Sequence, residues 1–336
     1  MLIQNASWIK MREAVSTIVP VFRKTFHTDR IIRSASLEVT CDGIYEASLN
    51  GERVGEFILA PGWTQYDKRL QVQCYDITDM LKEDNTLDVV VGNGWFRRTN
   101  APWTGTNNPD EFLPAMLIAV IHIMYADGIE EVIPTDESWQ VSESTITLSG
   151  IFTGEDVDMT KALVFEPAQV TDYPKNILIP QEGPQVKEQE HIYPKRSIRT
   201  PKDEWVLDFG QNMTGYMYFE MDAHAGEKLS ISTAEVLDKE GNFYTGNYRS
   251  ARSQMHYICC EGHQSYKPKL TFFGFRYLRI DEAPKGFSAD NIHAIVLHSE
   301  MDRTGWLDSS DPMLNQLFSN ILWSQKGNYL DIPTDC

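Results

Sequence analysis

The residues best suited to chemistry lie between Gly92 and Asp110. The string Gly92-Asn93-Gly94-Trp95-Phe96-Arg97-Arg98 is followed by Trp103, Asn107, Asn108 and Asp110. Carbohydrate sites stack an aromatic ring on the sugar and hydrogen-bond its hydroxyl groups through Asn, Asp or Arg side chains. The pattern therefore predicts a sugar-binding site made by Asn93, Trp95, Arg97, Trp103 and Asn108. In the alternative interpretation, Trp95 and Phe96 belong to the core and the arginines are solvated.

Other familiar catalytic patterns do not emerge from the residues themselves. Glu155, Asp156 and Asp158 bring carboxylates together, but a charged strand end is the usual explanation. The eight histidines are scattered without an H-x-x-x-H pair, so a zinc site is not indicated. The sequence also contains no G-x-G-x-x-G phosphate loop that opens a helix and no G-x-S-x-G elbow.

The elements that must position these residues are mainly β-strands. Short apolar and β-branched runs at 36–40, 87–91 and 116–121 are separated by turn signals such as Asp42-Gly43 and Asn50-Gly51. The segment 45–55 predicts a hairpin on a primed turn at Asn50-Gly51. Strands at this spacing favour an all-β chain made of sandwich or jelly-roll domains, of the galactose-binding type.

Changes in composition suggest four segments. We predict an N-terminal β-sandwich over 1–170 and a second β-sandwich over 204–300, where further strand patterns occur at 205–209, 229–232, 277–280 and 292–297. Between them, 171–203 is rich in proline and charge and reads as a connection, part of which enters the second domain. Residues 301–336 form the last segment, and we predict a helix within it.

Composition narrows the function classes. The 336 residues include 42% hydrophobic and 11% aromatic residues, which is typical of globular domains. A formal net charge of −18 argues against nucleic acid and anionic membranes as partners, because their phosphates would be repelled. It is compatible with a neutral ligand such as a sugar. No stretch approaches the roughly 20 apolar residues of a membrane span.

Localisation is predicted from the N-terminus and the cysteines. Residues 1–10 lack the basic and apolar regions of a signal peptide. The five cysteines are odd in number and have no metal-ligand spacing, so we expect free thiols in a reducing compartment. Both features favour a cytoplasmic location; the alternative is export by a signal that has been removed.

The last segment carries an apolar face that needs a partner. Asp311 is suited to an N-cap and Pro312 to the first helical position. Leu314, Leu317, Phe318, Ile321 and Leu322 then fall on one face of a predicted helix over about 311–329. We expect either the first helix of a helical domain that is absent here, with this face unusually exposed, or a terminal helix packed on the β domains. A homodimer through the exposed helix is a further expectation.

A series of strings along the chain resembles bacterial α-L-rhamnosidases, the inverting glycoside hydrolases of family 78. The N-terminal strings are 45–55, 61–69, 75–78 and 92–96, and those of the second domain are 208–215, 234–237 and 273–277. The segments 320–328 and 332–336 resemble the opening of the family's helical (α/α)6 barrel. The resemblance extends from about Trp8 to Cys336.

The resemblance implies that this chain holds the accessory β domains and the first helix of the catalytic domain. Asp335 would then be a carboxylate that binds or supports substrate, with the general acid and the general base both outside the chain. Inverting hydrolysis needs two carboxyl groups about 6.5–9.5 Å apart, so we expect the chain itself to be inactive. The missing catalytic domain and glycosides of L-rhamnose are the implied partners.

Two further functions stay open beside this one. The N-terminal domain resembles modules that bind rhamnose with calcium, so a stand-alone rhamnose-binding module is one alternative. In that case a Ca²⁺ ion in the N-terminal β domain is expected, although catalysis requires no cofactor. The other alternative is a pure scaffold for the barrel.

Overall fold

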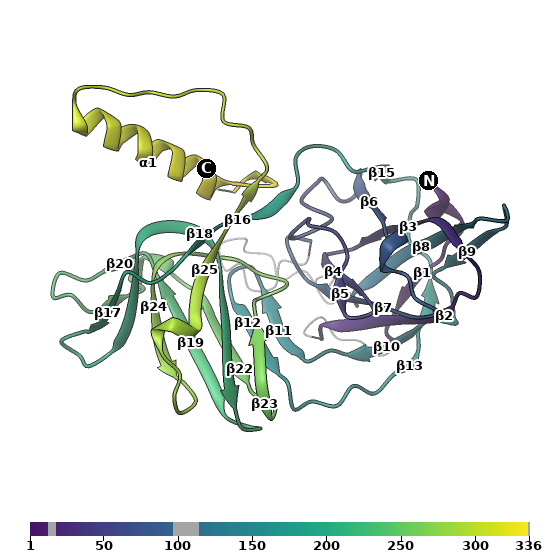
Figure 1. Ribbon diagram of the computed structural model, residues 1–336, viewed down its shortest axis with the longest axis horizontal. Helices are drawn as coiled ribbons and strands as arrows, with labels where there is room; N and C mark the ends of the chain where they lie inside the picture. The colour runs from purple at the N-terminus through teal and green to yellow at the C-terminus, as the bar shows by residue number, and fades with distance from the viewer. Residues whose placement is uncertain (13–17, 97–113, 335–336) are drawn as a thin grey trace. The chain divides into compact units, whose positions relative to one another are not determined.

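The computed structural model describes residues 1–12, 18–96 and 114–334. It divides into two compact units (Figure 1). Unit 1 comprises 1–151 and 161–182, and unit 2 comprises 152–160 and 183–336. The predicted all-β class is confirmed, because strands dominate both units and one α-helix follows them.

Unit 1 is a sandwich of two sheets. Its largest buried side chains are aromatic and include Trp8, Phe22, Phe57 and Trp139. One seven-stranded sheet contains β14 (Gln169–Thr171), β1 (Trp8–Lys10), β8 (Met116–Tyr125), β3 (Ile32–Cys41), β6 (Leu70–Asp76) and β15 (Leu178–Pro180) in that order, with β9 (Glu130–Pro134) paired to β8. The other contains β13 (Glu166–Pro167), β10 (Gln140–Glu143), β2 (Pro20–His27), β7 (Asp84–Gly92), β4 (Ile44–Leu49) and β5 (Glu52–Arg53). Unit 1 also holds β11 (Ile146–Gly150) and the short 3₁₀ turns η1 (Leu2–Asn5) and η2 (Thr78–Met80).

The local chemistry of unit 1 explains its pairing. Burial alternates along β7, where Leu87, Val89 and Val91 point into the core. The predicted hairpin is confirmed: β4 pairs with β5, and both Asn50 and Gly51 adopt positive φ, as a primed turn requires.

Unit 2 is built around one long strand. β18 (Trp205–Ala223) pairs with β24 (Phe273–Glu282), β25 (Ile292–Ser299), β17 (Arg196–Arg199) and β23 (Gly262–Tyr266). The sheet continues through β19 (Lys228–Ala234), β22 (Gln254–Ile258) and β12 (Gly154–Asp158) beyond β24, and through β16 (Val186–Ile192) beyond β25. Aromatic rings fill its core; Phe209 meets Phe275 and Phe219 meets Tyr257, both edge to face. Smaller elements are β20 (Val236–Leu237), β21 (Phe243–Tyr244), η4 (Gly246–Tyr248), η5 (Ala289–Asn291), β26 (Tyr329–Leu330) and β27 (Ile332–Pro333).

The structure divides the chain differently from the predicted boundaries. The connection predicted over 171–203 contains strands of both units, namely β14, β15, β16 and β17. Residues 154–158, predicted to lie in the first domain, form β12 of unit 2, because they pair in parallel with β22 about 100 residues later. Part of this segment enters the second domain, as predicted, because β16 and β17 belong to unit 2.

Helix α1 (Pro312–Asn328) begins as predicted. The Asp311 side chain accepts a hydrogen bond from the backbone N–H of Met313 at 2.8 Å, and Pro312 opens the helix. Its C-terminal end is fastened to unit 2, where Thr214 Oγ1 donates to the carbonyl of Gly327 at 3.0 Å and Lys326 pairs with Glu190.

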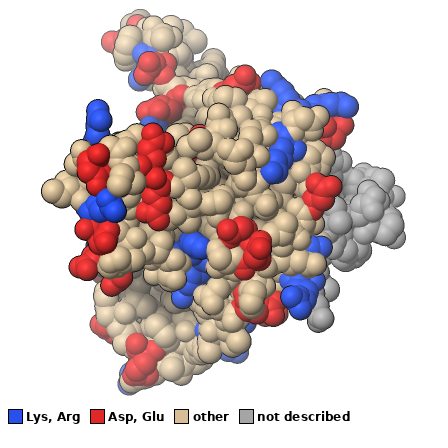
Figure 2. Space-filling model, turned by 90° about the vertical axis from the view of Figure 1, so that its right-hand side faces the viewer, with Lys and Arg blue, Asp and Glu red and all other residues tan. Residues whose placement is uncertain are grey.

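The charged surface matches the acidic composition. On the face shown in Figure 2, carboxylates and basic groups are interspersed and separated by uncharged surface. Among the described residues, no helix is long and apolar enough to cross a membrane.

Candidate functional site

The described part of the predicted sugar-binding string, residues 92–96, contributes two rings to a cluster of aromatic side chains. Trp95 stacks on Trp63 with ring centroids 5.8 Å apart and planes 19° apart. Phe96 meets Tyr66 edge to face at 5.0 Å. All four rings are half-buried, so they are neither core nor free surface residues. We call Trp63, Tyr66, Trp95 and Phe96 the aromatic patch.

The spacing of the two indoles limits how the aromatic patch could hold a sugar. Carbon atoms in contact are about 3.5–4.0 Å apart, so a sugar ring held between two aromatic planes would need them roughly 8 Å apart. Trp63 and Trp95 are closer than that. A sugar could therefore stack only on an outer face of the pair.

The remaining predicted site residues are distributed as follows. Asn93 is buried directly after β7. Arg97, Trp103, Asn108 and the supporting carboxylate Asp335 lie outside the described residues. Their predicted roles therefore stay predictions. Among the described residues, the structure brings Trp95 together with Trp63, which the sequence analysis had not selected as a site residue.

Unit 2 gathers polar residues that the sequence analysis missed. Asp208 on β18 is fully buried and accepts hydrogen bonds from Arg276 Nε at 2.8 Å, Arg196 Nη2 at 2.5 Å and the Gly210 backbone N–H at 2.7 Å. Burial alone would raise the pKa of this carboxyl, but the two guanidinium groups and the backbone donor outweigh it and lower the pKa to about 2. Asp208 is thus a fixed anion that orders two arginines.

A second polar cluster lies where three strings meet. Glu235, after β19, accepts hydrogen bonds from the amides of Asn212 at 3.3 Å and Asn247 at 2.8 Å. Nearby, the Tyr248 hydroxyl donates to the carbonyl of Gly274 at 2.7 Å. Asn212, Glu235 and Gly274 come from the strings 208–215, 234–237 and 273–277, which were quoted only for their resemblance. That resemblance was the one signal that could have pointed to this cluster.

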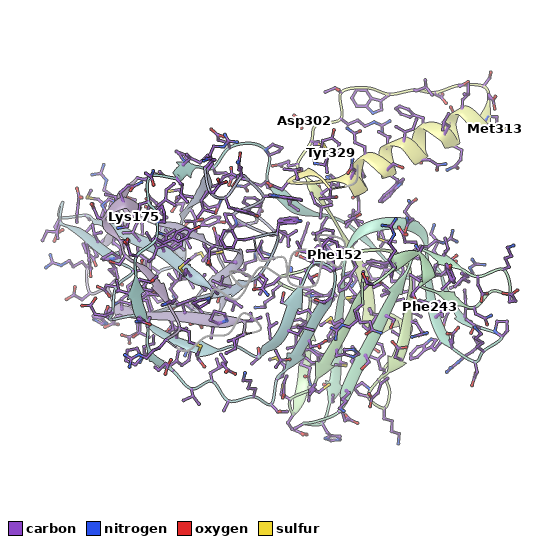
Figure 3. All side chains as sticks on the ribbon, turned by 180° about the vertical axis from the view of Figure 1, so that it is seen from behind. Phe152, Lys175, Phe243, Asp302, Met313 and Tyr329 are labelled. Atoms are coloured by element: carbon purple, nitrogen blue, oxygen red, sulfur yellow. The ribbon has the colours of Figure 1, made fainter. Side chains whose placement is uncertain are left out.

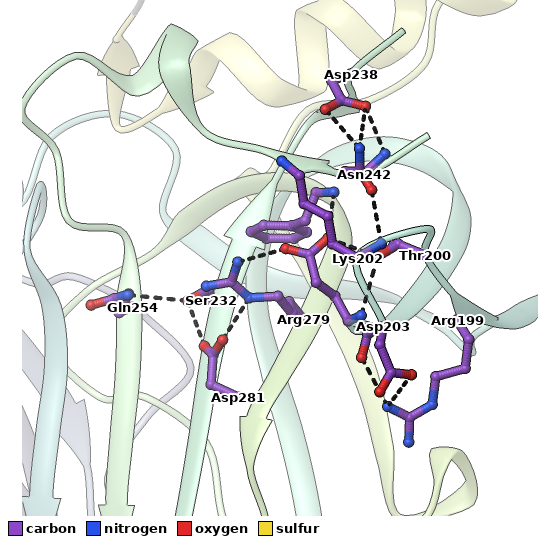
Figure 4. Close-up of polar contacts among 12 residues, drawn as sticks. Arg199, Thr200, Lys202, Asp203, Ser232, Asp238, Asn242, Gln254, Arg279 and Asp281 are labelled. Carbon is purple, nitrogen blue, oxygen red and sulfur yellow. Dashed lines mark hydrogen bonds and ion pairs between the residues drawn. The ribbon is translucent and has the colours of Figure 1, made fainter. Parts of the chain in front are cut away.

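Figure 4 shows a third polar cluster, which fastens the β20–β21 hairpin. Arg279 pairs with Asp281 at 2.5 Å, and its guanidinium lies 4.7 Å from the ring centroid of Phe243 on β21. Asn242 accepts from the Lys202 backbone N–H at 3.1 Å and donates to Asp238. Because each partner is another protein group, a structural role accounts for these contacts.

The apolar face of α1 is exposed, as predicted. No residue of this helix is buried, and Leu317 and Ile321 are each 53% exposed. Phe318 and Leu322 are half-buried. Figure 3 shows Met313 at the outer end of the helix, where it is 81% exposed. Contiguous apolar surface of this kind marks an interaction site.

Among the described residues, no three His, Cys, Asp or Glu side chains come together as a metal site. Calcium also binds backbone and amide carbonyl oxygens, so the Ca²⁺ ion expected in the N-terminal β domain stays a prediction. Cys74, Cys259 and Cys260 are free thiols.

Comparison with known proteins gives a consistent picture along the chain. Residues 30–190 match the α-L-rhamnosidase N-terminal domain, 198–298 the bacterial α-L-rhamnosidase concanavalin-like domain, and 302–336 the bacterial α-L-rhamnosidase six-hairpin glycosidase domain. An α-L-rhamnosidase of Streptomyces avermitilis is 35% identical over 90% of this chain and 31% of its own length. One from Alteromonas sp. is 32% identical over 99% of this chain and 39% of its own length.

Solved structures of α-L-rhamnosidases also resemble this chain. The crystal structure of an α-L-rhamnosidase from Aspergillus terreus superimposes with a TM-score of 0.92 at 32% identity, over 99% of this chain and 41% of that one. The enzyme from Dictyoglumus thermophilum gives a TM-score of 0.89 at 29% identity, over 99% and 40%. The chain thus spans between about a third and two fifths of the length of these relatives.

Proposed function

Because the chain belongs to the α-L-rhamnosidase family, we propose that it supplies the accessory β domains and the first helix of the catalytic domain in an inverting enzyme. That enzyme would remove terminal α-L-rhamnose from glycosides. One observation carries the proposal: three successive segments match three α-L-rhamnosidase domains. The cytoplasmic location inferred from the sequence belongs to the same proposal.

The buried carboxylates of unit 2 support a non-catalytic role. An inverting pair needs an acid with a raised pKa and a base, with room for substrate and water between them. Burial raises the pKa of Glu155 to about 7, but this side chain is fully enclosed, so no glycosidic oxygen reaches it. Asp208 is held by two arginines at a pKa of about 2 and cannot donate a proton at neutral pH. Neither can serve as the acid.

Hydrolysis of an aryl α-L-rhamnoside tests the proposal. We expect no turnover by the 336-residue chain alone. Turnover should appear when the chain is extended by the remaining six-hairpin domain of the Streptomyces avermitilis relative. In that extended protein, Asp335→Asn should reduce kcat sharply, whereas in the chain alone it should change nothing. Rhamnose release by the chain alone that Asp335→Asn abolishes would disprove the proposal.

A rhamnose-binding module is the second candidate function, and the aromatic patch favours it. Titration of the chain with L-rhamnose, measured by calorimetry, distinguishes a rhamnose-binding module from a pure scaffold. If the patch binds the sugar, Trp95→Ala should weaken binding about tenfold, the cost of one lost stacking contact. Trp306→Ala is the matched control, since Trp306 is a 75% exposed indole in unit 2. Absence of saturable binding would leave the scaffold role.

The proposed function also predicts what covers the exposed face of α1. We expect the rest of the helical domain to cover Leu317 and Ile321 in the whole enzyme, with a homodimer as the alternative for the isolated chain. Light scattering shows whether the isolated chain is a monomer or a homodimer. A concentration-dependent dimer that Leu317→Glu dissolves would support self-association through this face.

A further inference from the structure

The β20–β21 hairpin of unit 2 has one face packed on the unit and one face open. Phe243 belongs to a buried apolar cluster with Val206, and its cross-strand partner Leu237 packs against the same cluster. The other cross-strand pair, Val236 and Tyr244, points the opposite way, because side chains alternate along a strand. Val236 is 47% exposed and Tyr244 is 43% exposed. The hairpin therefore presents two large, mainly apolar side chains on its outer face.

Polar groups lie directly beside this outer face. Glu235 precedes Val236 and accepts hydrogen bonds from the side-chain amides of Asn212 at 3.3 Å and Asn247 at 2.8 Å. Both asparagines are exposed, and an amide carries two N–H groups and a carbonyl oxygen, so each can make further hydrogen bonds at the surface. An apolar centre with a polar rim is typical of protein interfaces. We call Asn212, Glu235, Val236, Tyr244 and Asn247 the hairpin face.

The hairpin face borders the place where α1 is fastened to unit 2. Asn212 and Thr214 flank the buried Met213 on β18, so their side chains point to the same side of the strand. Thr214 is the residue that donates to the carbonyl of Gly327, near the C-terminal end of α1. Two residues along a strand span about 7 Å, so Asn212 lies close to this attachment. Figure 1 shows α1 and β20 at the same end of unit 2.

The relatives indicate what covers the hairpin face. Residues 302–336, which include α1, match the six-hairpin glycosidase domain. The Aspergillus terreus enzyme superimposes over 99% of this chain but over only 41% of its own length. Under the proposed function, α1 opens the six-hairpin domain. The rest of that domain is then built at the end of unit 2 that holds both the helix and the hairpin face.

We propose that the hairpin face is a docking surface for the remainder of the six-hairpin domain in the same protein. Val236 and Tyr244 are buried against that domain, and Asn212 and Asn247 hydrogen-bond to it while they hold Glu235. This inference rests on the proposed function, and it adds a second contact, made by the sheet of unit 2, to the one made by the exposed face of α1. Two separate contacts fix the orientation of the catalytic domain on unit 2.

Hydrogen exchange measured by mass spectrometry tests the proposal. It compares the 336-residue chain with the extended protein of the hydrolysis assay and follows the peptides that cover residues 234–248. In the extended protein their amides should exchange at least about tenfold more slowly, because docking suppresses local opening of the hairpin.

Two variants of the extended protein locate the contact. Val236→Asp places a charge in the docked surface and should return the exchange of 234–248 to the rate seen in the chain alone. Tyr244→Ser should do so in part. Val132→Asp is the matched control, since Val132 is a 45% exposed valine on β9 of unit 1, and it should leave this exchange unchanged. In the chain alone, neither Val236→Asp nor Tyr244→Ser should change the urea midpoint, because both side chains are exposed there.

Three results would overturn the proposal. The first is equal exchange of 234–248 in the chain and in the extended protein. The second is protection in the chain alone that grows with protein concentration, which would identify a second copy as the occupant. The third is protection of the chain alone by L-rhamnose, which would identify a sugar site. Hydrogen exchange is measured whether or not the extended protein hydrolyses its substrate, so failure of this proposal and failure of the proposed function are distinguishable.

Discussion

Two buried carboxylates of unit 2 occupy contrasting environments. Glu155 on β12 and Asp208 on β18 are both completely shielded from solvent. Glu155 accepts hydrogen bonds from neutral donors, the Tyr266 hydroxyl at 2.7 Å and the Leu270 backbone N–H at 3.0 Å. Asp208 is bound by two guanidinium groups. Burial therefore raises the pKa of Glu155 to about 7, whereas the pKa of Asp208 falls to about 2.

The contrast shows what a buried carboxylate needs in order to stay charged. Hydrogen bonds from neutral groups reduce the cost of burial but do not remove it, so Glu155 takes up a proton near neutral pH. At Asp208, the positive charges of two arginines at contact distance outweigh the cost of burial, so the pKa falls. A carboxylate that solvent does not reach therefore stays charged when its partners are cations.

Removal of the Asp208 charge should have the largest effect. In Asp208→Asn, Arg276 and Arg196 lose the buried anion that they share, and we expect a loss of about 2 kcal/mol in the free energy of unfolding, as for the loss of hydrogen bonds to a charged group. Urea unfolding followed by circular dichroism measures it. Asp302→Asn, an exposed position in the same unit, is the control and should change stability little. Equal effects of the two variants would contradict the ion-pair interpretation.

The two arginines should differ in importance. Arg276 binds both oxygens of Asp208, through Nε and Nη2, and its side chain is 34% exposed, whereas that of Arg196 is 66% exposed. Lysine cannot reproduce the two-point contact. We expect Arg276→Lys to cost about 1–2 kcal/mol and Arg196→Lys about 0.5 kcal/mol or less. The same unfolding measurement ranks them, and the reverse order would show that the contact with Arg196 dominates.

Glu155 should give a small effect on stability at pH 7 and the clearest pH dependence. The folded state keeps its proton up to a pKa of about 7, whereas the unfolded chain releases it near the ordinary value of 4.5. The stabilisation is therefore complete below about pH 4.5 and disappears as the pH rises through 7.

Glu155→Gln removes this titration but keeps an acceptor for Tyr266. We expect its stability to lie within about 1 kcal/mol of the parent chain at pH 7. Between pH 4.5 and 7.5 its urea midpoint should vary less with pH than that of the parent. Parallel profiles would mean that Glu155 is charged throughout this range.

Local signals allowed part of this structure to be predicted. Asn50-Gly51 defined a turn and Asp311-Pro312 a helix start, because the backbone preferences of neighbouring residues decide both. The pairing of Asp208 with Arg276 joins residues 68 positions apart, and that of Glu155 with Tyr266 joins residues 111 apart. Hydrophobic periodicity does not report such distant contacts.

The candidate sites show the same limit. Trp95 could be selected as an aromatic residue beside polar ones, but its partner Trp63 could not, since only the fold brings the segment after β7 and the segment before β6 together.

The interleaved order of the two units has a consequence for synthesis on the ribosome. Strand β12, which carries Glu155, belongs to unit 2 yet precedes the last segment of unit 1, and its partner β22 follows about 100 residues later. At roughly 5–20 residues per second, β12 waits on the order of 5–20 seconds before β22 has been made. During that interval the nascent chain presents an unpaired strand edge, and a chaperone that shields such edges would act at this stage.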